Sequence, residues 1–215
     1  MPARSVAAEI RDCEGIVLDI GAADRWVGRR LGARARYLAL DFPATAIALY
    51  GARPDVFGDA CRLPLADASV AAVTCYEVLE HVRDPEALVA EVARVLAPGG
   101  VVEFTMPFLY PVHDAPHDFQ RWTRFGWERS LTAHRFVLER TRPGNPPLHA
   151  GAVVAALAIA GPLQDRRGWA LAWRLPIAAV LVLAVNLGAK MLGWAWPGWD
   201  AMASSYRVLA RKPGG

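Results

Sequence analysis

Short apolar runs of strand length follow one another along the first half of the chain, separated by turn residues. An uninterrupted apolar run bounded by turns is typical of a strand buried on both faces of a parallel sheet. Residues 85–96 instead place apolar side chains on one helix face, with Pro85 in the first turn. Residues 24–32 also predict a helix, with Asp24 as its N-cap. The expected strands are 15–21, 36–42, 55–60, the start of 69–82, 97–108 and a last strand within 202–213.

Strands that alternate with helices at this spacing predict an α/β fold with a doubly wound sheet. We expect one domain over residues 1–215. In such sheets, ligands bind at the carboxyl ends of the strands. Three of the expected strands end beside an acidic residue: Asp19, Asp41 and Asp59.

The composition becomes more apolar after Ala150, and residues 150–196 predict an apolar helical insertion before the last strand. Its longest uncharged stretch, 175–189, is closed by Arg174 and Lys190 and is shorter than the ~20 residues of a spanning helix. Two interpretations stay open: a lid over the substrate pocket, or a hydrophobic hairpin that contacts a membrane. Tryptophans that favour membrane interfaces flank the stretch, namely Trp169, Trp173, Trp194, Trp196 and Trp199. For the membrane alternative we expect reversible, salt-sensitive peripheral binding.

Charge and cysteine content limit the partners. The net charge is +3 and hydrophobic residues make up 54% of the chain, but acidic residues are scarce after Ala150. The basic pI of about 9.0 therefore belongs to the apolar tail region, and we expect no nucleic-acid partner. Three cysteines without a CxxC spacing favour a reducing cytoplasm. We expect a cytoplasmic protein, with peripheral contact to the inner face of the membrane as the alternative.

The segment "LDIGAADRW" (18–26) looks like a nucleotide-binding loop that has lost glycines. Gly21 is present, but Ala23 stands where a second glycine is usual. A dinucleotide needs glycines there because the backbone must approach the pyrophosphate. A ligand without phosphate relaxes this requirement, and alanine permits a tight turn at negative φ.

S-adenosylmethionine is such a ligand, and the three strand-end acids suit its parts. Asp19 is placed to bind the ammonium group, directly or through water. Asp41 is placed to accept both ribose hydroxyls, and Asp59 to accept from the adenine amino group. Taken singly, each aspartate is as well explained as a turn or capping residue.

The segments "VLDIGAADRWVG", "YLALDF", "GDACRLPLADAS", "EVLEHV" and "RVLAPGG", in this order and spacing, resemble the class I S-adenosylmethionine-dependent methyltransferases of the type 11 group. The resemblance covers about residues 15–140, with the last strand returning near 203–212. It implies a Rossmann-like, doubly wound seven-stranded sheet, here with the apolar insertion before the last strand. It also implies S-adenosylmethionine as cofactor, bound by Asp19, Gly21, Ala23, Asp41, Phe42, Asp59, Ala60 and Glu77.

Glu77, Glu80 and His81 form a short cluster that resembles the magnesium-binding segment of ubiquinone-biosynthesis O-methyltransferases. Magnesium prefers oxygen ligands, and histidine is a poor ligand for it. We therefore expect no metal here, and a role for this cluster in shaping the cofactor pocket.

The segment "PFLYPVHDAPHDFQRWT" (107–123) follows the fifth expected strand, where a methyl acceptor must approach. We predict His113 as the catalytic base, His117 as the second choice, and Asp118 as the residue that orients one of them. Arg121 is placed to hold the loop or an anionic acceptor. The alternative is that these charged pairs only lock a proline-rich loop. The spacing also resembles a loop of methyltransferases of bacterial cell-surface polysaccharide and glycolipid pathways.

We therefore expect methyl transfer from S-adenosylmethionine to a hydroxyl of a small, sugar or lipid-linked acceptor. The alternatives are a nicotinamide-dependent oxidoreductase of similar fold and a non-catalytic, membrane-associated cofactor-binding protein. The sequence does not identify the acceptor or the oligomeric state.

Overall fold

A computed structural model describes residues 5–51, 53–164 and 167–214. The chain divides into two compact units, which we call the sheet unit and the helical unit. The sheet unit comprises Met1–Met106, Asp114–Thr141 and Arg207–Gly215, and the helical unit comprises Pro107–His113 and Arg142–Tyr206.

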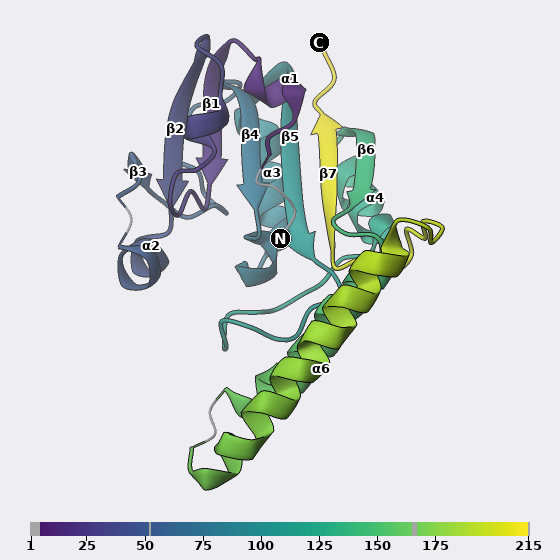
Figure 1. Cartoon of the computed structure of the whole chain (residues 1–215). Helices are drawn as coiled ribbons and strands as arrows, with labels where there is room; N and C mark the ends of the chain where they lie inside the picture. Colours follow the sequence, from purple (N-terminus) through teal and green to yellow (C-terminus); the bar gives the residue numbers. More distant parts are fainter. Residues whose placement is uncertain (1–4, 52, 165–166, 215) are drawn as a thin grey trace. The chain divides into compact units, whose positions relative to one another are not determined.

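A seven-stranded sheet in the order β3-β2-β1-β4-β5-β7-β6 confirms the Rossmann-like α/β fold (Figure 1). The pairings of β1 with β2 and β4, of β2 with β3, and of β4 with β5 are parallel. The strands are β1 (Gly15–Ile20), β2 (Ala35–Asp41), β3 (Val56–Phe57), β4 (Val70–Tyr76), β5 (Leu96–Pro107), β6 (Val137–Pro143) and β7 (Ser205–Arg211).

Six of these strands lie where the apolar runs predicted them, and β6 is additional. Most side chains of β6 are exposed or half-buried, so it lacks the apolar pattern of a core strand. The helices of the sheet unit are α1 (Ala8–Arg11), η1 (Gly28–Arg30), α2 (Pro43–Tyr50), η2 (Leu79–His81), α3 (Pro85–Val95) and α4 (Arg124–Ala133). Of these, α3 confirms the amphipathic helix expected at 85–96.

The helix expected at 24–32 is wrong. This segment contains turns and the single 3₁₀ turn η1. Ala23 (φ 41°) and Arg25 (φ 57°) both adopt left-handed backbone conformations, which an α-helix cannot contain. Asp24 is therefore no helix cap, and β1 is joined to β2 by an irregular loop.

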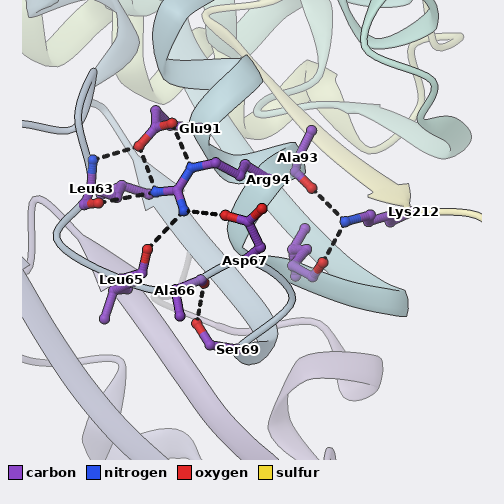
Figure 2. Close-up of polar contacts among 10 residues, drawn as sticks. Leu63, Leu65, Ala66, Asp67, Ser69, Glu91, Ala93, Arg94 and Lys212 are labelled. Carbon is purple, nitrogen blue, oxygen red and sulfur yellow. Dashed lines mark hydrogen bonds and ion pairs between the residues drawn. The ribbon is translucent and has the colours of Figure 1, made fainter.

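Arg94 of α3 fixes the loop that follows Asp59 (Figure 2). Its guanidinium donates to both carboxylate oxygens of Glu91 (2.7 and 2.8 Å) and to Asp67 Oδ1 (2.7 Å). It also donates to the carbonyl oxygens of Leu63 (3.0 Å) and Leu65 (2.8 Å). One planar cation thus holds residues 63–67 against α3, with a fork geometry that lysine does not have.

Lys212 donates hydrogen bonds to backbone carbonyl oxygens at the end of the same helix, α3. Its Nζ donates to the carbonyl oxygen of Ala93 (2.7 Å), as Figure 2 also shows, and to that of Leu96 (2.6 Å). Carbonyls in the last turn of a helix have no partner within the helix, and a cation is favoured there. The residue after β7 therefore ties the end of the chain to α3.

The helical unit contains α5 (Pro147–Ala160), η3 (Gly161–Leu163) and α6 (Trp169–Gly193). The expectation that the second apolar stretch is too short to span a membrane is wrong. Helix α6 runs for 25 residues and includes Arg174, Pro176 and Lys190 within it. Among the described residues, one helix, Leu171–Gly193, is long and apolar enough to cross a membrane by length and composition.

We predict that Arg94→Lys lowers the free energy of unfolding by about 1–3 kcal/mol, because one ammonium group cannot replace a guanidinium bonded to this many acceptors. Urea denaturation followed by circular dichroism measures this change. Arg36→Lys, at an exposed position of β2, is the control and should change stability by less than about 0.5 kcal/mol. Equal stability of the two variants would contradict the assigned role of Arg94.

Candidate functional site

The loop after β1 turns sharply at Gly21, in the first part of the site. Gly21 has φ 70°, and a Cβ at this position would lie 2.3 Å from Val78 Cγ2. A side chain is therefore excluded both by backbone conformation and by space. The amides of Gly21 and Ala22 donate to the carbonyl oxygen of Leu40 (2.9 and 3.2 Å), which ties this loop to the end of β2.

Ala23 adopts a backbone conformation that differs from the expected one. Its φ is 41°, in the left-handed region, whereas a negative φ was expected for alanine. This conformation directs the Ala23 amide to Asp41 Oδ2, at 3.0 Å. The alanine therefore adopts the backbone conformation of the missing glycine, at a modest energetic cost.

Asp41 is the last residue of β2, and two backbone amides fix the direction of its carboxylate. Oδ2 accepts from the Ala23 amide and Oδ1 accepts from the Phe42 amide at 2.8 Å. Each carboxylate oxygen has two lone-pair directions, so each oxygen of the buried Asp41 side chain can in principle accept a second hydrogen bond. A pair of neighbouring hydroxyls, such as a ribose diol, matches this arrangement, and Asp41 therefore fits the expected cofactor.

The other expected cofactor residues lie in the loops after neighbouring strands. Phe42, half-exposed, follows β2, and Asp59 and Ala60 follow β3. Asp59 Oδ1 accepts from the Cys61 amide at 2.8 Å, which fixes the direction of its side chain. Glu77 is exposed after β4, with φ 55°, and its amide donates to the Thr105 carbonyl (3.1 Å). The parallel sheet thus brings these residues to one edge.

Asp19 lies deeper than its expected role requires. Its side chain is 3% exposed, and its oxygens accept from Thr74 Oγ1 (2.7 Å) and from the Tyr37 hydroxyl (2.6 Å). Burial raises the pKa of Asp19 to about 6, and the two hydrogen bonds counteract part of that rise. Asp19 therefore joins β1 to β2 and β4, and its contact with a ligand stays a prediction.

Tyr37 and Thr74, the two partners of Asp19, are site residues that the sequence does not predict. Thr74 is the polar residue in the otherwise apolar run of β4, and it lies beside Asp19 in the strand register. That interruption was the available signal. Tyr37 gave no comparable signal, because tyrosine is common in strands.

Glu80 in η2 is a buried acid with an altered protonation equilibrium. Burial, followed by repulsion from Glu77, raises its pKa to about 8, while Arg121 acts in the opposite direction. Its Oε1 lies 3.7 Å from His81 Nε2, and His81 Nδ1 lies 2.7 Å from the His117 carbonyl oxygen. Perturbed acids of this kind gather at functional sites, although structural clusters also contain them.

Residues 117–121 pack against η2, and within this segment Asp118 and Arg121 form an ion pair. Arg121 donates to both oxygens of Asp118, through Nη1 to Oδ1 and through Nη2 to Oδ2 at 2.7 Å. The amide of Phe119 donates to the Glu80 carbonyl (2.8 Å), and Gln120 donates to the carbonyls of Leu79 and Val82. These contacts match the loop-locking alternative, because Arg121 donates to both oxygens of the Asp118 carboxylate.

The two candidate bases belong to different units. His117 is exposed in the sheet unit, with its ring edge-on to Phe119 at 6.4 Å. His113 belongs to the helical unit, where its ring lies edge-on to Tyr110 at 5.3 Å and its Nδ1 lies 3.4 Å from the Pro111 carbonyl oxygen. The roles of His113, His117 and Asp118 in catalysis stay predictions.

Comparison with known proteins adds independent information. Residues 18–104 match a family model described as a methyltransferase domain. The chain is 31% identical over 121 residues to a 2-phytyl-1,4-naphthoquinone methyltransferase of Thermosynechococcus vestitus, covering 53% of each chain. It is 45% identical over 75 residues to a demethylmenaquinone methyltransferase of Mycolicibacterium paratuberculosis, covering 33% of each. The chain therefore spans between a third and about half of the length of these relatives.

Solved structures share the fold. A geranyl diphosphate C-methyltransferase of Streptomyces coelicolor, in complex with S-adenosylhomocysteine, superposes with a TM-score of 0.55 at 12% identity. The match covers 95% of this chain and 76% of the other. At this identity the likeness establishes the fold alone. The family match makes residues 18–104 similar to a methyltransferase domain, and S-adenosylmethionine stays the expected cofactor.

We predict that Asp41→Ala weakens the binding of S-adenosylhomocysteine by roughly 1.5–3 kcal/mol, because the ribose diol loses its charged acceptor. Titration calorimetry measures the dissociation constant. The control is Asp12→Ala, which removes an exposed aspartate paired with Arg11 after α1. Wild-type affinity in a folded Asp41→Ala protein would overturn the site assignment.

We predict that Glu80→Gln stabilises the protein at alkaline pH. A folded-state pKa of about 8, above the ordinary 4.5, means that folding favours the protonated acid. The stability that protonated Glu80 contributes is complete below pH ~4.5 and is lost as the pH rises through ~8. The variant should therefore gain on the order of a few kcal/mol over wild type near pH 8, and little near pH 4.

Urea titrations at several pH values measure this difference, with Glu128→Gln on the exposed surface of α4 as the control. A constant difference between wild type and Glu80→Gln across this pH range would contradict the assignment.

Proposed function

We propose that the chain, whose residues 18–104 match a methyltransferase domain, is a class I S-adenosylmethionine-dependent methyltransferase that transfers the methyl group of this cofactor to a hydroxyl of a small or lipid-linked acceptor. The observation that supports it most strongly is the Asp41 carboxylate, oriented by two backbone amides at the end of β2. A nicotinamide-dependent oxidoreductase of similar fold is less well supported, because the loop lacks the second and third glycines and the matching family is that of methyltransferases.

Two observations support a lipid-linked acceptor. The relatives named above are, by their names, methyltransferases of a phytyl-substituted naphthoquinone and of demethylmenaquinone. A phytyl group is a long apolar chain, so such an acceptor partitions into lipid. The helical unit of this chain also exposes many large apolar side chains.

For methyl transfer to a hydroxyl, the protein has to align the two reactants and remove a proton. When bound, S-adenosylmethionine supplies a methyl carbon activated by its positively charged sulfur. Asp41 orients the adenosine part through the ribose, and the loops at the ends of β3 and β4 bound the same site. His113 would serve as the base that takes the proton of the acceptor hydroxyl, while the methyl carbon leaves the sulfonium for the hydroxyl oxygen and S-adenosylhomocysteine departs; such a base contributes roughly 10²–10⁴-fold.

The proposal is tested by incubating the purified chain with S-adenosylmethionine that carries a tritiated methyl group. The acceptors offered are a phytyl-substituted naphthohydroquinone, a water-soluble naphthohydroquinone and a lipid extract of bacterial membranes. Label in the organic phase that depends on the protein and disappears in Asp41→Ala supports the proposal. Cofactor binding without labelled product from any acceptor would contradict it.

We predict that His113→Ala lowers turnover by at least about tenfold and leaves the dissociation constant of S-adenosylhomocysteine within about twofold of wild type. The reason is that a base contacts the acceptor and not the adenosine. His117→Ala is the matched variant and should keep most of the activity. If His117→Ala loses more turnover than His113→Ala, the second choice is the base and the assignment is wrong.

A further inference from the structure

Helix α6 is the longest apolar element and is scarcely buried. Its segment Leu171–Gly193 has a mean hydropathy of 2.0, and only 6% of its most apolar window is buried. The core helix of a soluble protein with this composition would be mostly buried. At 1.5 Å per residue the segment measures about 35 Å, close to the ~30 Å hydrocarbon thickness of a bilayer.

The side chains that helices α5 and α6 bury are all small, whereas their large apolar side chains are exposed or half-buried. The buried residues of the two helices are Ala150, Ala152, Ala178 and Ala189. Apart from two tryptophans in the first turns of α6, the exposed large apolar residues are Val154, Leu175, Ile177, Val180, Leu181, Leu183, Leu187, Met191 and Leu192. In a water-soluble protein the large apolar side chains would be buried between the helices. In lipid, small residues let helices approach closely and large residues face the acyl chains.

The two helices form a hairpin whose ends lie together. The Gly144 amide donates to the Ser205 carbonyl (2.8 Å), and Asn145 Nδ2 donates to Ser204 Oγ (2.7 Å). A Cβ on Gly193 would lie 2.5 Å from the ring of His149, so the start of α5 meets the end of α6. The chain therefore leaves and returns at one place, and Gln164 and Arg167, the described residues nearest to the turn between η3 and α6, mark the far end of the hairpin, which we call its tip.

The polar residues of the hairpin mark its ends. Exposed tryptophans stand near the start of α6 (Trp169, 84% exposed) and just after it (Trp194, 86% exposed). Arg174, whose guanidinium lies over the Trp173 ring at 5.0 Å, and Lys190 bracket the uncharged middle. The amide nitrogen of Asn186, in that middle, donates to the Val182 carbonyl (2.8 Å). Aromatic belts and long cationic side chains at both ends are typical of a membrane-spanning segment.

Neither α5 nor α6 has a polar face, because apolar residues surround both helices. A helix that lies in the plane of the membrane surface needs one polar and one apolar face. The uniform apolarity therefore favours insertion over the salt-sensitive surface contact expected from the sequence. The charge of Arg167, in the tip, limits how deep the tip can lie. A charge is costly at the bilayer centre, so the tip must reach a headgroup layer.

We propose that the α5–α6 hairpin inserts across a lipid bilayer. Its tip lies at one headgroup layer, and the start of α5 and the end of α6 lie together at the other. The segment Pro147–Leu163, about 25 Å long as a helix, returns the chain with slight local thinning of the bilayer. This inference stands apart from the proposed methyl transfer; only its corollary, an acceptor taken from the membrane, rests on that function.

The test is flotation of the full chain, purified in detergent and reconstituted into vesicles of phosphatidylcholine with a minor fraction of phosphatidylglycerol. We expect wild type to float and to stay bound in about 1 M salt and in alkaline carbonate, because insertion is not held by surface charge. Val180→Arg places a charge at an exposed position near the middle of α6 and should lower the vesicle-bound to free ratio at least tenfold. Trp169→Arg, at the exposed start of the helix, is the control and should stay within about threefold of wild type.

Release of wild type by salt would overturn insertion in favour of surface contact. A detergent-free, water-soluble dimer that does not float would overturn it in favour of a second copy covering α6. Equal flotation of Val180→Arg and wild type would overturn it as well. Calorimetry with S-adenosylhomocysteine on each variant separates the two proposals, since lost cofactor binding with intact flotation would count against the methyl-transfer site alone.

Discussion

Parallel pairing of β1 between β2 and β4 is the constraint on which the site depends. It sets Asp19 beside Ala39 and Thr74, and it brings the carboxyl ends of the strands to one edge of the sheet. Residues far apart in sequence, from Gly21 to Glu77, therefore gather in the loops of that edge. The loop after β1 then completes the arrangement, because its backbone amide at Ala23 fixes the carboxylate of Asp41.

The same edge contains acids that the protein keeps away from water. Asp19 and Glu80 both have pKa values raised by burial, and each is only partly compensated by its hydrogen-bond or charge partners. Asp118 and Arg121 hold the segment that packs against η2, so the surroundings of Glu80 are fixed by contacts from 117–121. The fold tolerates this electrostatic cost at the carboxyl ends of its strands, where binding sites of this fold occur.

Much of the sheet and the position of Asp41 could be predicted, because buried strands and strand-end acids have a strong local pattern. The failures have local causes as well. The loop at 24–32 is no helix because Ala23 and Arg25 adopt left-handed conformations, which no propensity reveals. Strand β6 has no apolar pattern because it is largely exposed, and helix α6 extends beyond the uncharged stretch because Arg174 and Lys190 lie within it and do not end it. The burial of Asp19 by Tyr37 depends on the strand register, which the sequence does not state.

The central claim is that Asp41 is the ribose acceptor of an S-adenosylmethionine site at the end of β2. The most direct measurement is a crystal structure of the chain with bound S-adenosylhomocysteine. The account predicts both ribose hydroxyls within about 2.5–3.2 Å of the two Asp41 oxygens, with the amides of Ala23 and Phe42 still bonded to the same carboxylate. A nucleoside bound with its ribose away from Asp41 would contradict the account.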